Sequence, residues 1–281
     1  MKIIIRNCNV AELDIPLKYA TKLYNEFAIR HPNAFYLRTR QRGMQNWDGK
    51  IKYITKTGQF KIGLLPSVYK RCIELGIKPI IVDMRQPLPK VSKVVTQIGK
   101  YKLRPEQEKA VKAILSNKLG ETPFQIGVLD YTVNAGKTLI MSALYLSYKK
   151  QLKTLLITND SDWLNQARDE FKQYLPGEDI TFVQGKVLNW SNFTIGMVQS
   201  ISRNMKYYQN ELAKIDMVLI DEADQGGSKQ YQNAITRLFN TRVRIGLSGT
   251  IYMSKLAKDK VKNMNLRCFF GDVLAEFKLK D

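Results

Sequence analysis

Five consecutive residues near the middle of the chain have the composition of a phosphate-binding loop: Asn134, Ala135, Gly136, Lys137 and Thr138. They follow an apolar run and precede a segment with helical spacing. Backbone N–H groups at the start of a helix bind phosphate oxygens, and the helix dipole adds to the attraction. Lys137 can reach the β and γ phosphates of a nucleotide, and the Thr138 hydroxyl can ligate Mg²⁺. The strict motif begins with glycine, where this chain has Tyr131.

A second group with possible chemistry, Asp221-Glu222-Ala223-Asp224, ends another apolar run. Ionised carboxylates at the end of a buried strand need a cation nearby, because desolvation penalises the charge. We expect Asp221 to hold Mg²⁺, directly or through water, and Glu222 to orient and deprotonate an attacking water. The alternative is an acidic helix start, where the dipole favours Asp and Glu. The phosphate-binding loop favours the magnesium interpretation.

The elements that must position these groups follow an α/β pattern from about residue 100 onward. Strands are expected at 126–130, 154–158, 194–198, 217–221 and 242–248, and helices at 105–117, 137–150, 162–174 and 230–239. Apolar strands between helices indicate a parallel sheet with helices on both faces. Ligands of such sheets bind at the carboxyl ends of the strands, where both polar groups lie.

Three further segments complete a recognisable order of motifs. Residues 103–107 precede the first strand, 194–200 lie between the two polar groups, and 246–250 end the last strand. With the literal Asp-Glu-Ala-Asp box, this order resembles helicase superfamily 2. The resemblance covers about 100–281 and implies a RecA-like P-loop fold, ATP and Mg²⁺ as cofactors, and ATP hydrolysis coupled to nucleic acid.

Further site residues are implied by this resemblance alone. Gln107 would read the adenine edge, with Arg104 beside it in the nucleotide site. Ser248 and Thr250 would link Asp224 to the nucleic-acid surface. Segments 158–163 and 196–199 would touch the nucleic-acid backbone. The arginine fingers of a second RecA-like domain would have to come in cis or in trans, so the isolated chain is expected to hydrolyse ATP weakly.

The charge of the chain points to a polyanionic partner. Of 281 residues, 45 are Lys or Arg and 25 are Asp or Glu, a formal net charge of +20. Residues 1–100 alone hold 19 Lys and Arg against 6 Asp and Glu. Such a density favours nucleic acid over a merely solvated surface.

Composition excludes several other classes of protein. A hydrophobic content of 44% argues against disorder, and no apolar run is long enough for a transmembrane helix. The cysteines Cys8, Cys72 and Cys268 are far apart, and with His31 as the only histidine they do not suggest a zinc site. We expect a cytoplasmic protein with no membrane partner, in the host cytoplasm if the chain is viral.

The front of the chain is expected to form a small basic α/β (α+β) domain at residues 1–85. A linker at 86–99 and a RecA-like motor domain at 100–281 would follow. Strands are expected at 2–6, 50–55 and 78–83, and helices at 16–29 and 66–75.

Within this front domain, the candidate nucleic-acid contacts are basic residues of one aromatic-rich segment: Arg38, Arg40, Arg42, Lys50 and Lys52. Their alternate spacing puts the three arginines on one face if the segment is extended. We expect most aromatic residues there, which are Phe35, Tyr36 and Trp47, to belong to the core. Asp48-Gly49 is expected to be a hairpin turn.

Residues 46–51 (Asn-Trp-Asp-Gly-Lys-Ile) and 63–66 (Gly-Leu-Leu-Pro) are similar to the front domain of phage recombination helicases of superfamily 2. This resemblance implies a helicase or branch-migration motor of recombination and fork repair, with branched or forked DNA as partner. Thr132 departs from the family pattern, which has proline there. Two alternatives remain: a restriction-type duplex DNA translocase subunit, and an ATP-regulated nucleic-acid-binding module without helicase activity.

Overall fold

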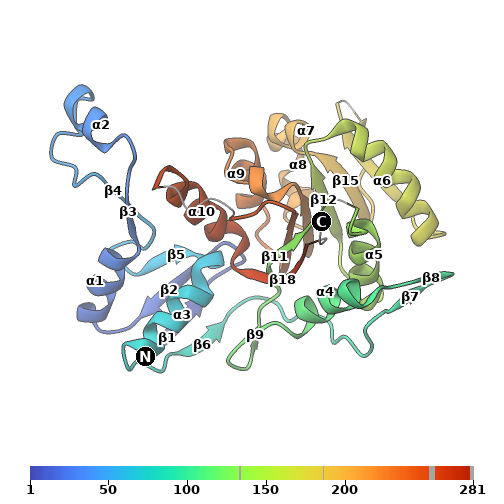
Figure 1. The fold of residues 1–281 in the computed structure, drawn as a ribbon, viewed down its shortest axis with the longest axis horizontal. Coiled ribbons are helices and arrows are strands. Elements are labelled where there is room, and N and C mark those ends of the chain that lie inside the picture. Colours follow the sequence, from blue (N-terminus) through green and yellow to red (C-terminus); the bar gives the residue numbers. More distant parts are fainter. Residues whose placement is uncertain (133, 186, 253–256, 279–281) are drawn as a thin grey trace.

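A small mixed sheet and a large parallel sheet lie side by side in the computed structural model of the chain (Figure 1). The structure describes residues 1–132, 134–185, 187–252 and 257–278. In this part of the chain, no helix combines the length and the apolar character needed to cross a membrane.

The small sheet has the strand order β5-β2-β1-β6. β1 pairs antiparallel with β2 and parallel with β6. The strands are β1 (Lys2–Ile5), β2 (Val10–Asp14), β5 (Gln59–Lys61) and β6 (Ile80–Asp83), and the helices are α1 (Leu17–Glu26) and α3 (Leu65–Glu74), which follows η1 (Ile62–Leu64). The structure therefore confirms both predicted helices, and it confirms the strands predicted at 2–6 and 78–83, all with shifted ends.

A projecting segment, the arm, comprises residues 28–52 and departs most from expectation. β3 (Ala28–Arg30) and β4 (Lys50–Lys52) pair antiparallel, and the excursion between them carries α2 (Ala34–Arg40). Figure 1 shows α2 at the far end of the arm, away from both sheets. The helix predicted at 16–29 therefore ends early, because its last residues enter β3.

Two predictions about the arm are wrong, and the condition for a third is not met. The segment is helical rather than extended, so Arg38 and Arg40 lie about 200° apart around α2 instead of on one face. Phe35 and Tyr36 are 79% and 54% exposed rather than in the core, because they lie on the excursion between two three-residue strands.

Asp48-Gly49 is also not a hairpin turn. The connection between β3 and β4 spans residues 31–49, and Asp48 instead accepts a hydrogen bond from the Lys50 N–H at 2.9 Å. Gly49 takes the left-handed conformation, with φ of 76°. Trp47 is half-buried, and its ring nitrogen donates to the Lys50 carbonyl at 3.0 Å.

The large sheet has the strand order β14-β13-β15-β12-β16-β17-β11-β18. All of these strands except β14 pair in parallel, which makes seven. β14 pairs antiparallel with β13 at one edge of the sheet. The strands are β11 (Ile126–Tyr131), β12 (Thr154–Thr158), β13 (Ile180–Gln184), β14 (Val187–Leu188), β15 (Phe193–Met197), β16 (Met217–Asp221), β17 (Val243–Ser248) and β18 (Val273–Phe277). All five predicted strands are present, and β13, β14 and β18 were not expected.

Helices cover both faces of this sheet. One hydrophobic cluster joins one face to α4–α6, and a second joins the other face to α7–α10. The helices are α4 (Pro105–Ser116), α5 (Lys137–Ser147), α6 (Ser161–Tyr174), α7 (Val198–Arg203), α8 (Met205–Leu212), α9 (Lys229–Thr236) and α10 (Ala257–Phe270). Short elements complete the chain: β7 (Gln97–Ile98), β8 (Tyr101–Lys102), β9 (Lys118–Leu119), β10 (Thr122–Pro123) and η2 (Ala223–Gln225).

The core of the small sheet is continuous with the α7–α10 side of the large sheet. Ile3 and Leu65 belong to the same buried cluster as Val218 and Ile220. The segment expected to be a linker also packs, since Leu88 and Val91 contact the cluster on the other face. The division at 85 and 99 therefore stays a prediction, whereas the α/β class and the parallel sheet are confirmed.

Candidate nucleotide site

The loop between β11 and α5 turns through two left-handed residues. Asn134 has φ of 64°, and Gly136, which caps α5, has φ of 72° and ψ of 43°. A Cβ at position 136 would lie 2.3 Å from the side-chain nitrogen of Gln107. The left-handed backbone thus favours glycine at position 136, and a larger side chain there would also displace the Gln107 amide.

Gln107 and Arg104 support this loop from α4. Gln107 is 3% exposed, accepts a hydrogen bond from the Arg104 N–H at 2.9 Å, and donates to the Ala135 carbonyl at 2.9 Å. Arg104 Nη2 donates to the same carbonyl at 2.8 Å. The structure places both residues against the loop, and their roles toward adenine stay predictions.

Asp221 lies opposite Lys137 across the carboxyl end of the sheet. Its carboxylate is 3.8 Å from Lys137 Nζ, and the residue is 4% exposed. Burial raises the pKa of Asp221 to about 6, with Lys137 opposing and Glu222 reinforcing the shift. Glu222 follows with φ of 52°, a conformation unfavourable for most side chains. The two predicted halves of the site are therefore brought together.

The donor set fits a nucleotide-bound Mg²⁺. Asp221 is buried and its lysine lies beyond hydrogen-bond distance, so a divalent cation would offset the desolvation of the carboxylate. Thr138 lies in the first turn of α5 and is 6% exposed. The described residues form no cluster of three or more His, Cys, Asp or Glu suited to a metal. Phosphate oxygens and water would have to complete the coordination, which is usual for Mg²⁺.

Asp224, Ser248 and Thr250 form a hydrogen-bonded group beside this site. The Ser248 hydroxyl donates to Asp224 at 2.9 Å and accepts from the Thr250 N–H at 3.2 Å. The two hydroxyls lie 3.4 Å apart. The resemblance implied a link among these three residues, and the structure brings them into contact.

Other contacts at this edge had no signal in the sequence. Asn159 donates to Gln225 at 2.6 Å and its carbonyl accepts from Gln199 at 3.3 Å, connecting the loop after β12 to η2 and α7. Lys278, which follows the unexpected strand β18, donates to Asp130 at 2.5 Å and to the Gly249 carbonyl at 2.7 Å. Both sets join residues far apart in the chain, which periodicity does not report.

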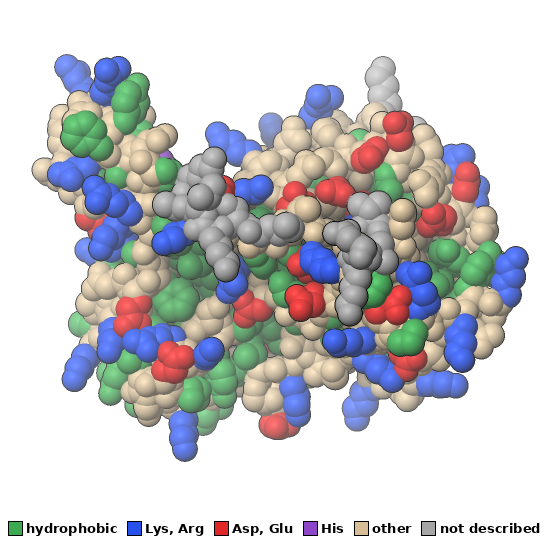
Figure 2. Space-filling view, viewed as in Figure 1, with side chains coloured by type: hydrophobic (Ala, Val, Ile, Leu, Met, Phe, Trp, Pro, Cys, Tyr) green, Lys and Arg blue, Asp and Glu red, His purple; other side chains and the backbone are tan. Residues whose placement is uncertain are grey.

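The predicted nucleic-acid residues gather on the arm, away from the nucleotide site (Figure 1). Arg38, Arg40, Arg42 and Lys50 are exposed. Figure 2 shows blue and green side chains together there. Lys52 differs, because it is half-buried, pairs with Asp48 at 3.1 Å and lies 4.5 Å from the centre of the Tyr24 ring.

Comparison with protein families gives one match over more than half of the chain. Residues 100–253 match the ResIII family, described as the res subunit of type III restriction enzymes. The chain belongs to this family. The match begins just before α4 and runs beyond β17, so it includes the whole nucleotide site.

Two curated relatives are similar to this ResIII chain. The ATP-dependent DNA helicase uvsW of Enterobacteria phage T4 is 24% identical over 249 residues, 81% of this chain and 47% of the relative. A putative ATP-dependent RNA helicase of Acanthamoeba polyphaga mimivirus is 25% identical over 147 residues, 52% of this chain and 27% of the relative. The chain thus spans half or less of the length of these relatives.

Solved structures confirm the fold of the ResIII chain, including its front part. A crystal structure of the UvsW helicase from bacteriophage T4 has a TM-score of 0.74 at 22% identity, covering 99% of this chain and 100% of that one. A second T4 UvsW structure gives 0.72 at 20% identity, covering 97% and 56%. These structures confirm the RecA-like fold, and the family match together with the curated relative confirms the resemblance to superfamily 2 helicases.

Proposed function

We propose that this chain is the front domain and first motor domain of an ATP-dependent DNA helicase or branch-migration motor that acts in recombination and fork repair. The observation that carries the proposal is the meeting of Lys137 and Asp221 at one sheet edge, 3.8 Å apart, beside the Ser248–Asp224 hydrogen bond. The first pair suits nucleotide binding, and the second offers a route from the nucleotide to a DNA-binding surface.

The residues divide the work of ATP hydrolysis. Lys137 and the N–H groups at the start of α5 bind the β and γ phosphates. Thr138 and Asp221 hold Mg²⁺, which neutralises charge on the phosphates when bound. Glu222 is half-buried at the same edge and accepts the proton of the attacking water.

DNA is the proposed partner, and the arm is the proposed contact. Exposed arginines neutralise backbone phosphates, and the exposed rings of Phe35 and Tyr36 offer stacking surfaces for unpaired bases. Unpaired bases occur at forks and junctions, which favours branched over linear duplex DNA. The similarity to a phage DNA helicase supports the same partner.

A second RecA-like domain, in cis or in trans, is part of the proposal. Arginine fingers contribute about 10³–10⁵ to the rate in related phosphoryl transfers. The isolated chain is therefore proposed to bind ATP and hydrolyse it slowly.

A restriction-type duplex translocase is the second candidate, because the family description favours it. The front part argues against it, since the similarity to the T4 helicase structure extends over 99% of the chain. An assay that follows strand separation and, in parallel, displacement of a triplex strand distinguishes the two functions. Triplex displacement without unwinding or branch migration would favour the translocase.

The decisive experiment combines this chain with its second motor half. ATP hydrolysis is measured with linear duplex, forked DNA and no DNA, for the wild type and Lys137→Ala. We expect hydrolysis that forked DNA stimulates and that the substitution abolishes. ATP binding without any hydrolysis would instead indicate the ATP-regulated binding module.

A further inference from the structure

A cavity of about 400 Å³ lies at the junction of the two sheets, at the end opposite the nucleotide site. Its front-domain wall comes from the β1–β2 turn and the segment after β6, including Cys8 and Arg85. Its other wall comes from residues just before β12, β16 and β17, including Asp216 and Arg242. The nucleotide site lies at the carboxyl ends of β11 and β16. The cavity lies at the amino ends of the strands, so the two sites are at opposite ends of the strands of the large sheet.

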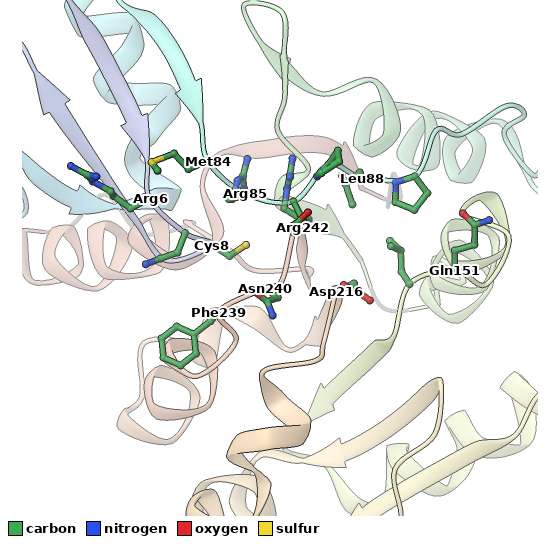
Figure 3. Close-up of a pocket in the computed structure, with 15 residues that line it drawn as sticks. Arg6, Cys8, Met84, Arg85, Leu88, Gln151, Asp216, Phe239, Asn240 and Arg242 are labelled. Atoms are coloured by element: carbon green, nitrogen blue, oxygen red, sulfur yellow. The ribbon is translucent and has the colours of Figure 1, made fainter.

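Two arginines line this cavity and share one carboxylate. Arg85 binds Asp83 through Nε and Nη2, both at 2.9 Å, and Arg242 Nη2 lies 3.3 Å from the same carboxylate. Their side chains are only 2% and 7% exposed. Figure 3 shows them side by side, with Cys8 below them. They also line a neighbouring cavity of about 610 Å³.

The two guanidinium groups retain unused donors. Arg85 Nη1 and Arg242 Nε are buried, and neither has a hydrogen-bond partner among the residues that the structure describes. A buried donor without an acceptor is unfavourable, and more so when the group is charged. An acceptor in the cavity would satisfy these donors once the guanidinium groups turn toward it.

A third arginine adds to the excess of positive charge. Arg244 is 1% exposed and donates to neutral oxygens, the Cys8 carbonyl at 2.7 Å and the Asn9 side chain at 2.8 Å. Burial lowers the pKa of Arg244 to about 10, and Arg85 reinforces the shift. Among the described residues, Asp83 is thus the carboxylate that forms ion pairs with Arg85 and Arg242.

Other acidic groups at the cavity do not pair with these arginines. Burial raises the pKa of the Cys8 thiol, which keeps it neutral although the three arginines oppose the shift. Asp216 also lines the cavity, but its carboxylate accepts from the Lys153 N–H at 3.0 Å and forms no ion pair with these arginines among the described contacts. Buried cations without matching anions are unfavourable, so an anion is the ligand that this cluster favours.

We propose that the cavity binds a phosphate group, held by Arg85 and Arg242 and bridging the front domain to the motor. Guanidinium groups bind phosphate oxygens in pairs, and a phosphate anion offsets positive charge that the cluster leaves unpaired. A volume of about 400 Å³ accommodates a small phosphorylated molecule. The same chemistry could come from a phosphate of a DNA strand, and the experiment separates these sources.

The test measures binding of inorganic phosphate by calorimetry at constant ionic strength. It uses Lys137→Ala protein, because the nucleotide loop would otherwise contribute a second phosphate site. We expect one saturable phosphate per chain, with an affinity about tenfold or more lower in Arg242→Gln. Weak, unsaturable binding that sulfate and chloride reproduce would indicate an adventitious ion only and overturn the proposal.

Two matched variants at Cys8 test the proposal even if Arg242→Gln fails to fold. Cys8→Asp places a carboxylate beside all three arginines and should abolish phosphate binding while keeping or raising the melting temperature. Cys8→Ser, a neutral control of similar size, should bind phosphate like its parent. Equal binding in Cys8→Asp and Cys8→Ser would overturn the assignment of this cavity.

A final experiment adds short duplex and forked DNA to the phosphate-loaded protein. Retention of phosphate in the presence of DNA assigns the site to a small phosphorylated molecule. Displacement of phosphate by DNA, together with weaker DNA binding in Cys8→Asp than in Cys8→Ser, assigns the site to a DNA backbone phosphate. Both results support a phosphate site at the junction, and neither depends on ATP hydrolysis or on the proposed motor function.

Discussion

Ser248 donates a hydrogen bond to Asp224 at 2.9 Å, which joins the end of β17 to the turn that follows β16. The serine is fully buried, and its oxygen also accepts from the Thr250 N–H. The bond therefore ties together two loops that lie at the nucleotide edge of the sheet.

Substitution Ser248→Ala should separate ATP hydrolysis from work on DNA. Loss of a buried hydrogen bond costs about 1 kcal/mol, so the fold should survive. We expect ATP affinity to be unchanged and unwinding by the complete motor to fall much more than hydrolysis. The measurement compares ATP consumed per base pair opened. Parallel loss of both activities would argue against a coupling role.

Lys137→Ala should abolish measurable ATP binding and leave the melting temperature of the ligand-free protein nearly unchanged. The residue opens α5 and faces Asp221 at 3.8 Å, too far for a strong ion pair. Calorimetry with Mg²⁺ checks the binding, and thermal melting checks the fold. Equal ATP affinity in the variant would sink the assignment of the loop.

Asp221 should make the ligand-free protein less stable as the pH rises. Its pKa is raised by burial from 3.8 to about 6, so the folded state binds the proton more tightly than the unfolded state. Stability is then fully present below pH 4 and declines up to pH 6, by roughly 2–3 kcal/mol.

Urea unfolding of Asp221→Asn and the wild type between pH 4 and pH 8 measures this effect. The variant should be the more stable protein at pH 7 and equal to the wild type near pH 4. Asp169→Asn, an exposed change on α6, serves as control and should show no such difference. A constant gap between Asp221→Asn and the wild type at all pH values contradicts the prediction.

The arm should carry most of the salt dependence of DNA binding. Each lost phosphate contact changes the slope of log K against log salt by about 0.9. Replacing Arg38, Arg40 and Arg42 by Gln should reduce the slope by up to about three such steps, without loss of stability, because all three are exposed.

Replacing Lys109, Lys112 and Lys118 by Gln removes the same charge from exposed positions on and beside α4. This control should change the slope little. An equal reduction in both triple variants would show that DNA responds to total charge and not to the arm. Deleting residues 1–85 would be a poorer test, since the buried core is shared between Leu65 and Val218.

The nucleotide site could be predicted from sequence because its parts are local. A buried strand, a short loop and a helix start place Lys137 and Thr138 at an edge without any long-range information. The arm could not be predicted in this way. A single sequence does not say whether a Phe35 ring meets another element, and here it meets solvent.

The contacts of the buried arginines could not be predicted from the sequence either. Arg244 lies within the buried strand β17, and its side chain reaches Cys8 and Asn9, more than 230 positions away in the chain. Gln107 likewise reaches Ala135 across 28 positions. Such contacts depend on how elements pack, which neither spacing nor composition reports.

Glu222→Gln should leave ATP binding intact and stop turnover. The change keeps the shape of the side chain and leaves Lys137, Thr138 and Asp221 in place, but removes the proton acceptor. We expect hydrolysis to fall by about 10²–10⁴ in a protein with both motor halves.

The isolated chain is a poor test, because its wild-type rate should already be low without arginine fingers. Adding the second half should therefore raise the wild-type rate and leave the variant flat. Fast hydrolysis by the isolated wild-type chain, indifferent to DNA and to the added domain, would refute the arginine-finger argument. The chain would then be a self-contained ATPase, and the helicase proposal would fail with it.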